Sequence, residues 1–181
     1  MQEKDKKVIV LYKSKYGSTK RYAEWIAKEA GADLLEASKV KVEDLYRYDT
    51  VVFGGSLHAV GIKGVKLITD HFDKLMDKKL IVFAVGCSPG REEAIKHVEA
   101  NNFTEEMRNK INFFYLRGAF NYKQLGFIDR FMMNALRGKL KKKKEEELDE
   151  DSKGLLAAFH EPIDWTDQKS ILPLVACIRG Q

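Results

Sequence analysis

The chain has 181 residues, of which 44% are hydrophobic and 33% charged, and its formal net charge is +5. This length allows one sizeable core and excludes two ordinary domains, so we expect a single domain over residues 1–181. No run of about eighteen apolar residues occurs, which excludes the usual pattern of a membrane-spanning helix. A short polar start that leads straight into a strand indicates a cytoplasmic protein.

Short apolar runs rich in β-branched residues alternate with segments of helical periodicity. Strands are predicted at residues 8–12, 34–37, 50–53, 80–85 and 113–116, the second of them at an edge of the sheet. Helices are predicted at residues 22–30, 65–76 and 94–98, around Met107, and at 171–178. In the last helix Pro173 requires a kink or a later start, and Thr166 or Asp167 can cap it. The alternation predicts a doubly wound α/β fold with a parallel sheet and helices on both faces.

The segment at about 120–160 exceeds what this alternation needs, and we treat it as an insertion. Its first part places apolar residues on one helical face, namely Ile128, Phe131, Met132, Ala135 and Leu136. Its second part is the charged run from Lys139 to Glu147. We interpret the insertion as a packed amphipathic helix followed by a solvated charged loop, because such charge runs are common on protein surfaces.

The loop after the first strand has the composition of a phosphate site. It consists of Ser14, Lys15, Tyr16, Gly17, Ser18 and Thr19, directly before a helix. A helix start offers unpaired N–H groups and the positive end of the dipole, and serine and threonine hydroxyls add hydrogen bonds. The simpler alternative is that Ser18 or Thr19 only caps the helix. A Walker A loop and a dinucleotide fingerprint do not fit, because Gly17 is the loop's one glycine.

This loop resembles that of the flavodoxin family, in which a hydroxyl residue, a glycine and a threonine recur at the spacing of Ser14, Gly17 and Thr19. The resemblance implies the sheet order 2-1-3-4-5 and an FMN bound non-covalently, with its phosphate held by residues 14–19. It also implies two loops beside the isoalloxazine ring, at Gly54 to Gly61 and at Gly86 to Gly90. The residues expected beside the ring are Ser56, Leu57, His58 and Ala59 in one loop and Gly86, Cys87 and Ser88 in the other.

In these two loops the glycines and Ser56 would let the backbone approach the flat ring closely. Neither loop contains Trp, Tyr or Phe, and the chain is basic. The electron-carrier flavodoxins, by contrast, are acidic and sandwich the ring between aromatic side chains. The sequence therefore does not favour a plain electron shuttle.

A second resemblance is to the flavodoxin-like, menaquinone-dependent protoporphyrinogen dehydrogenase family. It rests on Arg117 to Tyr122, Asp129 to Met133 and Asp164-Trp165, while His58 and Ala59 stand where that family has bulkier residues. It implies an FMN-dependent oxidoreductase with a porphyrinogen substrate, a quinone or a redox partner protein, and an insertion that contacts substrate or membrane. Nucleic acid is not an expected partner.

Two alternatives remain open at this point. An electron-transfer module would use the charged insertion to dock another protein. A non-redox receiver domain shares this fold but needs an acidic residue at the end of the third strand, where Gly54 and Gly55 stand.

Single residues add little to the choice. Cys87 and Cys177 belong to no CxxC pair, so neither a metal site nor a disulfide is expected, and we interpret Cys87 as a small packed residue. His58 can exchange protons at neutral pH, but a loop histidine is often only solvated, so no catalytic side chain is assigned. We expect Trp25 and Trp165 to pack as aromatic cover. Arg130 and the lysines at 141–144 can meet carboxylates, lipid headgroups or an acidic partner.

Overall fold

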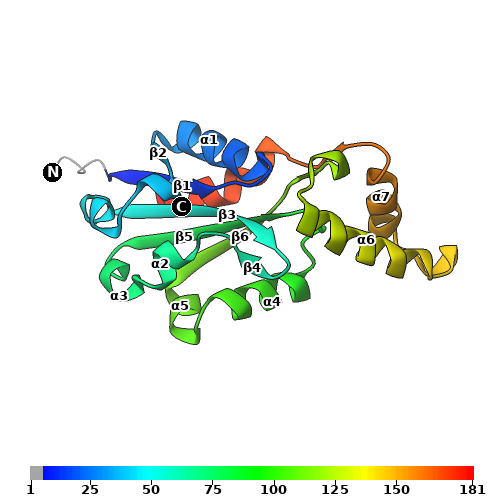
Figure 1. The fold of residues 1–181 in the computed structure, drawn as a ribbon. Helices are drawn as coiled ribbons and strands as arrows, with labels where there is room; N and C mark the ends of the chain where they lie inside the picture. Colours follow the sequence, from blue (N-terminus) through cyan, green and yellow to red (C-terminus); the bar gives the residue numbers. More distant parts are fainter. Residues whose placement is uncertain (1–5) are drawn as a thin grey trace.

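The computed structural model describes residues 6–181, and residues 1–5, which belong to the polar start, lie outside the described residues. The centre is a parallel sheet in the order β2-β1-β3-β5-β6 (Figure 1). Its strands are β1 (Val8–Lys13), β2 (Asp33–Glu36), β3 (Thr50–His58), β5 (Lys79–Gly86) and β6 (Ile111–Arg117). A short strand, β4 (Gly61–Ile62), pairs antiparallel with the end of β3. The predicted α/β class and strand order are confirmed.

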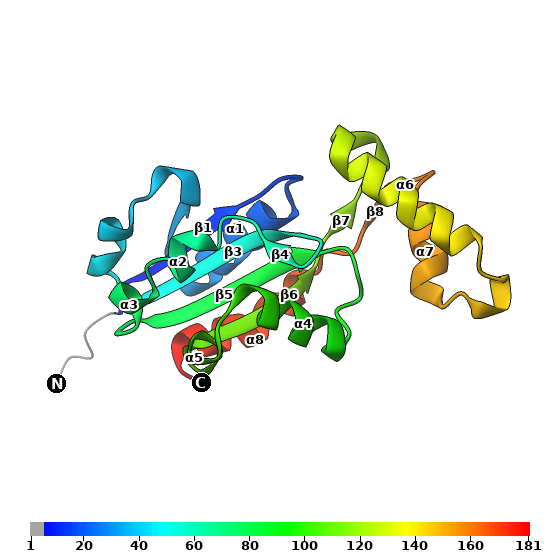
Figure 2. The same cartoon turned by 60° about the horizontal axis from the view of Figure 1, so that its bottom comes forward.

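Helices cover both faces of the sheet (Figures 1 and 2). One face carries α1 (Ser18–Ala30) and α8 (Leu172–Arg179), and the other carries α2 (Lys66–Thr69), α3 (Phe72–Leu75), α4 (Glu92–Asn102) and α5 (Glu105–Lys110). Neighbouring side chains of a strand point to opposite faces. Val10 therefore packs under α1 and α8, whereas Ile9 and Leu11 belong to the core on the other face. All three are fully buried, as the continuous apolar run indicates.

The ends of the two helices on the first face follow from single residues. Gly31, with φ of 62°, ends α1 in the left-handed conformation that glycine adopts without strain. The side chain of Asp167 accepts a hydrogen bond from the backbone N–H of Lys169 at 2.9 Å and starts a 3-10 turn over Gln168–Ile171. The helix α8 begins only after this turn, with Pro173 in its first turn, where no N–H is needed. The later start is confirmed, but the predicted cap is wrong for α8 itself, because Asp167 caps the preceding 3-10 turn and no side chain caps α8.

Two element predictions are wrong. Residues 65–76 form two short helices, α2 and α3, because His71 has a non-helical backbone between them, and Met76 is exposed. The third strand does not end at Phe53 but continues to His58. It continues because β5 pairs with it as far as Ser56 and β4 pairs with Leu57 and His58. The predicted second flavin loop is therefore mostly strand, and only its tip at 59–60 turns.

The glycines of β3 serve a different purpose from the one expected. Gly54 and Gly55 are buried within the sheet. A Cβ at Gly54 would lie 2.0 Å from Cζ of Phe83, and one at Gly55 would lie 2.5 Å from Cγ2 of Ile62. These positions lack side chains so that the core can close around them, and not to let a ring approach the backbone.

The insertion is more elaborate than the sequence indicates. After β6 the chain forms β7 (Ala119–Phe120), α6 (Phe127–Lys141), α7 (Glu150–Ala158) and β8 (Ile163–Asp164). The strands β7 and β8 pair antiparallel and make a neck, beyond which α6 and α7 lie outside the end of the sheet (Figure 2). The neck and α7 were not predicted. No helix among the described residues combines the length and apolar character needed to cross a bilayer.

The predicted packing of the insertion helix is wrong. Ile128 and Phe131 are 67% and 71% exposed, and Phe127 is 88% exposed. Within α6 the side chains that the structure buries are Asp129 and Leu140. The helix is thus turned with its apolar stripe outward and one carboxylate inward. The hydrogen bonds of that carboxylate explain the orientation and are described next.

Candidate functional site

The loops that follow β1, β3 and β5 lie at the carboxyl end of the sheet, where ligands bind in open parallel α/β folds. The first loop runs from Ser14 to Gly17 and leads into α1. The second is the turn at residues 59–60 between β3 and β4, and the third starts at Cys87 after β5. The insertion begins after β6 at the same end of the sheet (Figure 2).

The start of α1 provides free backbone donors. Gly17 is its N-cap, with φ of 97°, and no side chain caps the helix. The alternative in which Ser18 or Thr19 caps the helix is therefore wrong. In the described part of the chain, the N–H groups of Ser18, Thr19 and Lys20 have no hydrogen-bond partner. Such a helix start, at the positive end of a helix of 13 residues, is suited to an anion.

The hydroxyls of the first loop hold its shape. Ser14 Oγ accepts a hydrogen bond from the N–H of Gly17 at 3.1 Å, and Ser18 Oγ accepts one from Ala119 at 3.0 Å. In the adjacent strand, Ser56 Oγ accepts from the N–H of Lys15 at 3.1 Å and shares a hydrogen bond with Thr19 Oγ1 at 2.9 Å. Because Ser14 and Ser18 act as acceptors, their own O–H protons remain available for a ligand.

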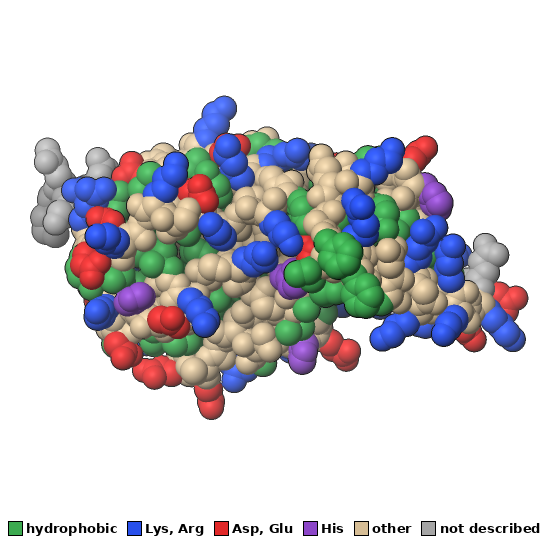
Figure 3. Space-filling model, viewed as in Figure 1, with side chains coloured by type: hydrophobic (Ala, Val, Ile, Leu, Met, Phe, Trp, Pro, Cys, Tyr) green, Lys and Arg blue, Asp and Glu red, His purple; other side chains and the backbone are tan. Residues whose placement is uncertain are grey.

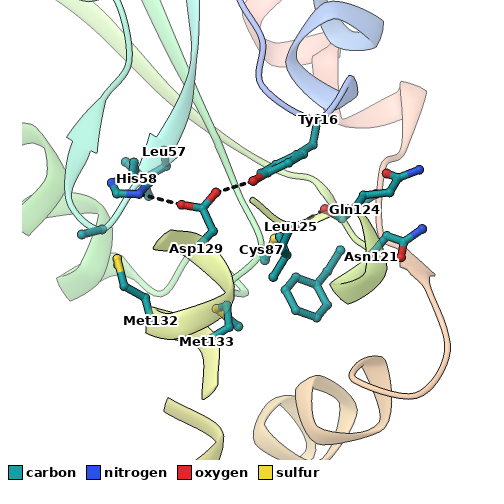
Figure 4. Close-up of a pocket in the computed structure, with 13 residues that line it drawn as sticks. Tyr16, Leu57, His58, Cys87, Asn121, Gln124, Leu125, Asp129, Met132 and Met133 are labelled. Atoms are coloured by element: carbon teal, nitrogen blue, oxygen red, sulfur yellow. Dashed lines mark hydrogen bonds and ion pairs between the residues drawn. The ribbon is translucent and has the colours of Figure 1, made fainter. Parts of the chain in front are cut away.

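A cavity of about 180 Å³ lies between the loops and the insertion (Figure 4). Its lining includes five of the residues predicted from the sequence, namely Tyr16, Leu57, His58, Ala59 and Cys87. The opposite wall comes from residues 119–133 of the insertion, including Asp129, Met132 and Met133. The structure thus brings the first, second and third predicted loops together around one space, and the insertion completes the enclosure.

Asp129 is the point where the insertion meets the loops. Its Oδ2 atom accepts hydrogen bonds from Lys15 Nζ at 2.5 Å and from the Tyr16 hydroxyl. Its Oδ1 atom accepts one from His58 Nε2 at 2.8 Å (Figure 4). The Tyr16 hydroxyl also accepts a hydrogen bond from the N–H of Gly126, just before α6, at 3.1 Å. One carboxylate therefore joins two loops of the sheet to the insertion.

The charge of Asp129 follows from these contacts. Burial raises the pKa of this carboxyl, but the hydrogen bonds from Lys15, Tyr16 and His58 outweigh burial and lower the pKa to about 2. The same contact with Asp129 raises the pKa of Lys15. The pair is therefore ionised at neutral pH. The position of Asp129 in the first turn of α6, at the positive end of the helix dipole, adds to the stability of the carboxylate.

The third loop contributes less than expected. The Gly86 carbonyl accepts a hydrogen bond from the N–H of Gly118 at 2.7 Å, and Ser88 Oγ shares one with the Tyr115 hydroxyl at 3.0 Å. Neither Gly86 nor Ser88 lines the cavity. Burial raises the pKa of the Cys87 thiol to about 11, so the thiolate is disfavoured and Cys87 acts as a packed residue.

A second set of ion pairs holds α7 to the third loop. Arg91 pairs with Asp149 and lies 3.7 Å from Asp151, and Arg117 lies 3.3 Å from Asp151. The Arg117 guanidinium also stacks on Trp165 at 4.2 Å from the ring centroid. These pairs are more exposed than the Asp129 cluster. They fix the outer side of the insertion, whereas Asp129 fixes the side that faces the cavity.

Sequence comparison assigns the chain to a family. A sequence model described as the flavodoxin domain matches residues 9–147. The chain belongs to the flavodoxin domain family. A search among curated proteins found no match.

Solved flavodoxin-fold structures are similar to this flavodoxin-family chain at low identity. A flavoprotein described as putative, from Bacteroides eggerthii, is 18% identical and has a TM-score of 0.45, covering 61% of this chain and 86% of its own. A WrbA-like flavodoxin from Agrobacterium tumefaciens is 22% identical, with a TM-score of 0.41 and coverages of 60% and 82%. The Trp repressor binding protein of Bacillus subtilis is 16% identical, with a TM-score of 0.46 and coverages of 62% and 86%. Likenesses this distant carry no argument about function.

Membership of the flavodoxin family implies a flavin cofactor, and the residues at the end of the sheet fit one. The unpaired N–H groups at the start of α1 suit a phosphate. The cavity beside them is lined by apolar side chains and by five polar ones, with Tyr16, His58 and Asp129 joined by hydrogen bonds and Asn121 and Gln124 apart from them. An apolar wall with a few polar groups is typical of a site for a flat ring.

The depressed pKa of Asp129 can be measured directly. A folded-state pKa below the ordinary value near 3.8 means that the contacts of Asp129 stabilise the closed insertion above about pH 4 and are lost as the pH falls toward 2. We expect ¹³C NMR of the Asp129 carboxyl to give a midpoint near 2, and the variant Lys15→Met to raise it. A midpoint at or above 3.8 in the wild type contradicts the described contacts.

Proposed function

We propose that the protein is an FMN-dependent oxidoreductase that encloses an organic substrate beneath its insertion and passes the electrons to a quinone or a partner protein. The observation that carries this proposal is the cavity shared by the flavin loops and the insertion. A carrier that exchanges electrons with other proteins needs only an exposed ring edge. Here Met132 and Met133 of α6 form an apolar wall opposite Leu57 and Ala59, which favours a bound substrate.

The roles of the residues follow from their positions. The N–H groups at the start of α1 and the hydroxyls of Ser14 and Ser18 would hold the phosphate of FMN, while the buried Thr19 hydroxyl bonds to Ser56. Leu57, Ala59 and Cys87 would border the ring, which supplies the transfer of one or two electrons when bound. His58, which is hydrogen-bonded to Asp129, places an imidazole at the cavity, a group that can donate or accept a proton in catalysis. We assign no nucleophile.

The second family resemblance names a candidate substrate class. Arg117, Asp129 and Trp165 belong to the segments similar to protoporphyrinogen dehydrogenases. In this structure Asp129 lines the cavity, and Arg117 stacks on Trp165 at the base of the insertion. We therefore propose a porphyrinogen as substrate and a menaquinone as acceptor. The alternative function is that of an electron-transfer module, in which the charged end of the insertion would dock a redox partner protein.

The outer face of α6 supports a peripheral contact with a membrane, where quinones reside. Its exposed apolar residues away from the cavity are Phe127, Ile128, Phe131 and Leu136. A cluster of hydrophobic side chains is visible near the middle of this face of the molecule, with basic side chains to its right (Figure 3). The basic residues Lys139 and Lys141 to Lys144 follow along the same segment and are exposed. Aromatic and aliphatic side chains beside lysines suit the interface of an anionic bilayer.

The phosphate site predicts a preference for FMN over riboflavin. The double variant Ser14→Ala and Ser18→Ala should lower the affinity for FMN at least tenfold, because phosphate donors are removed, while the affinity for riboflavin stays within about twofold. Fluorescence titration with both ligands measures this, and Ser38→Ala, an exposed hydroxyl of a distant turn, is the control. Equal binding of FMN and riboflavin by the wild type would contradict the assignment of the loop.

The oxidoreductase proposal predicts turnover that depends on both partners. Under anaerobic conditions the FMN-loaded protein should oxidise protoporphyrinogen when a water-soluble menaquinone analogue is present, and not without it. Porphyrin fluorescence follows the product. A rate equal to the uncatalysed background, together with rapid electron exchange with a flavodoxin reductase, would instead favour the electron-transfer module.

The proposed membrane contact predicts selective vesicle binding. The wild type should sediment with vesicles containing phosphatidylglycerol and much less with pure phosphatidylcholine. The double variant Phe127→Ser and Phe131→Ser should lose at least tenfold in binding, because about 0.8 kcal/mol is lost for each CH₂ group that no longer enters the bilayer. Leu172→Ser, which removes an exposed apolar side chain from α8, is the matched control and should bind like the wild type. Undiminished binding of the double variant would exclude α6 as the contact.

A further inference from the structure

A narrow neck joins the insertion to the rest of the protein. Two strands of two residues each, β7 and β8, form the neck that joins it to the sheet (Figure 2). Past the neck, α6 lies over the cavity at the end of the sheet and forms one of its walls. A two-stranded ribbon is marginally stable by itself, so contacts beyond the neck must decide where the cover lies.

Those contacts are unusual for a helix at a cavity wall. The apolar stripe of α6 points outward, and in its half nearest the cavity the buried side chain is Asp129, which is 8% exposed. The other buried side chain, Leu140, lies three turns further along, near the end of the helix. Apart from Met132 and Met133, which line the cavity, the contacts that hold this half of α6 over it are therefore polar.

The contacts of Asp129 are strong and cooperative. Lys15, Tyr16 and His58 donate to its two oxygens from two separate loops, and Tyr16 also holds the N–H of Gly126. Asp129 itself is nearly buried, so its charge is costly when its partners are removed, whereas the side chains of Lys15 and His58 are 32% and 38% exposed. The contacts hence form and break together, which is the behaviour expected of a latch.

The cavity is smaller than most ligand sites. Sites that hold small molecules usually measure about 300–1,000 Å³, whereas this cavity measures about 180 Å³ with α6 in place. A ligand larger than the cavity gains room when α6 moves away from the loops that form the other wall. The contact that bridges these walls is that of Asp129 with the loops.

We propose that α6 is a movable cover over the cavity and that Asp129 is its latch, released from Lys15, Tyr16 and His58 whenever a ligand enters or leaves. The identity of the ligand rests on the proposed function, whereas the opening of the cover does not. On the other side of the insertion, Arg91 and Asp149 pair at exposed positions, where such pairs contribute little. Arg117 and Asp151 are partly buried, and their pair holds α7 beside the end of β6 and not at the cavity.

Hydrogen exchange without any flavin tests the opening. In Asp129→Asn we expect the amides of residues 127–137 to exchange at least tenfold faster than in the wild type, while those of β5 are unchanged. The control Asp149→Asn removes a carboxylate of the same insertion that is largely exposed, and should change exchange in α6 less than twofold. His58→Ala removes one donor from the side of the sheet and should give an intermediate increase. Unchanged exchange of α6 in both Asp129→Asn and His58→Ala overturns the proposal.

The rates of FMN exchange separate the latch from a simple ligand contact. A latch slows entry and exit alike, so stopped-flow fluorescence should show that both association and dissociation of FMN are at least tenfold faster in Asp129→Asn. Faster dissociation with unchanged association and unchanged hydrogen exchange makes Asp129 a ligand contact and overturns the latch. If no variant binds FMN but α6 opens in Asp129→Asn, the proposed function fails and the latch stands.

Discussion

A carboxylate buried between two loops and a helix is costly unless every oxygen is satisfied, and Asp129 is in that position. It is satisfied because Lys15 and Tyr16 from the loop after β1 and His58 from the end of β3 converge on it. The orientation of α6, with its apolar stripe toward solvent, follows from this convergence. So does the cavity, since α6 is one of its walls. The chemistry of the site therefore depends on this cluster as much as on the sheet.

The sheet supplies the other requirement, a fixed platform. Strands β1, β3 and β5 are buried on both faces, so the loops at their carboxyl ends start from positions that hardly move. The loop after β1 turns at Gly17, and the N–H groups at the start of α1 remain unpaired. The hydrogen bond from the N–H of Lys15 to Ser56 Oγ holds this loop to β3. A rigid anion site next to a covered cavity suits the proposed function, in which the cofactor stays bound while substrate and product exchange.

Local patterns in the sequence were enough to predict the strands of the sheet and the loop after β1. The apolar runs around Val10, Val52 and Val82 predict buried parallel strands, and the hydroxyls and glycine of residues 14–19 predict the helix start that can bind phosphate. The resemblance to flavodoxins added the two further loops. Residues Leu57 to Ala59 do lie at the cavity, although as the end of a strand and a turn. Gly86 and Ser88 do not line it, because they bond to Gly118 and Tyr115.

The orientation of the insertion helix could not be predicted from the sequence, for a physical reason. Periodicity shows that residues 128–136 have an apolar face but not which way that face points, since the outcome depends on partners far away in the chain. Asp129 finds its partners 114 and 71 residues earlier, at Lys15 and His58. A single acidic residue between Ile128 and Phe131 was the available signal, and its meaning appears only when the loops are in place. The neck of β7 and β8 is similarly short and gives no pattern of its own.

The central claim is that the insertion and the flavodoxin loops together form one flavin site. A crystal structure of the protein with FMN tests it most directly. The account predicts the phosphate against the N–H groups of Ser18 to Lys20, and the ring between Leu57 and Cys87 with Met132 or Met133 in contact with it. A ring that lies beside the loops without touching any residue of α6, or a phosphate bound away from the start of α1, would contradict it.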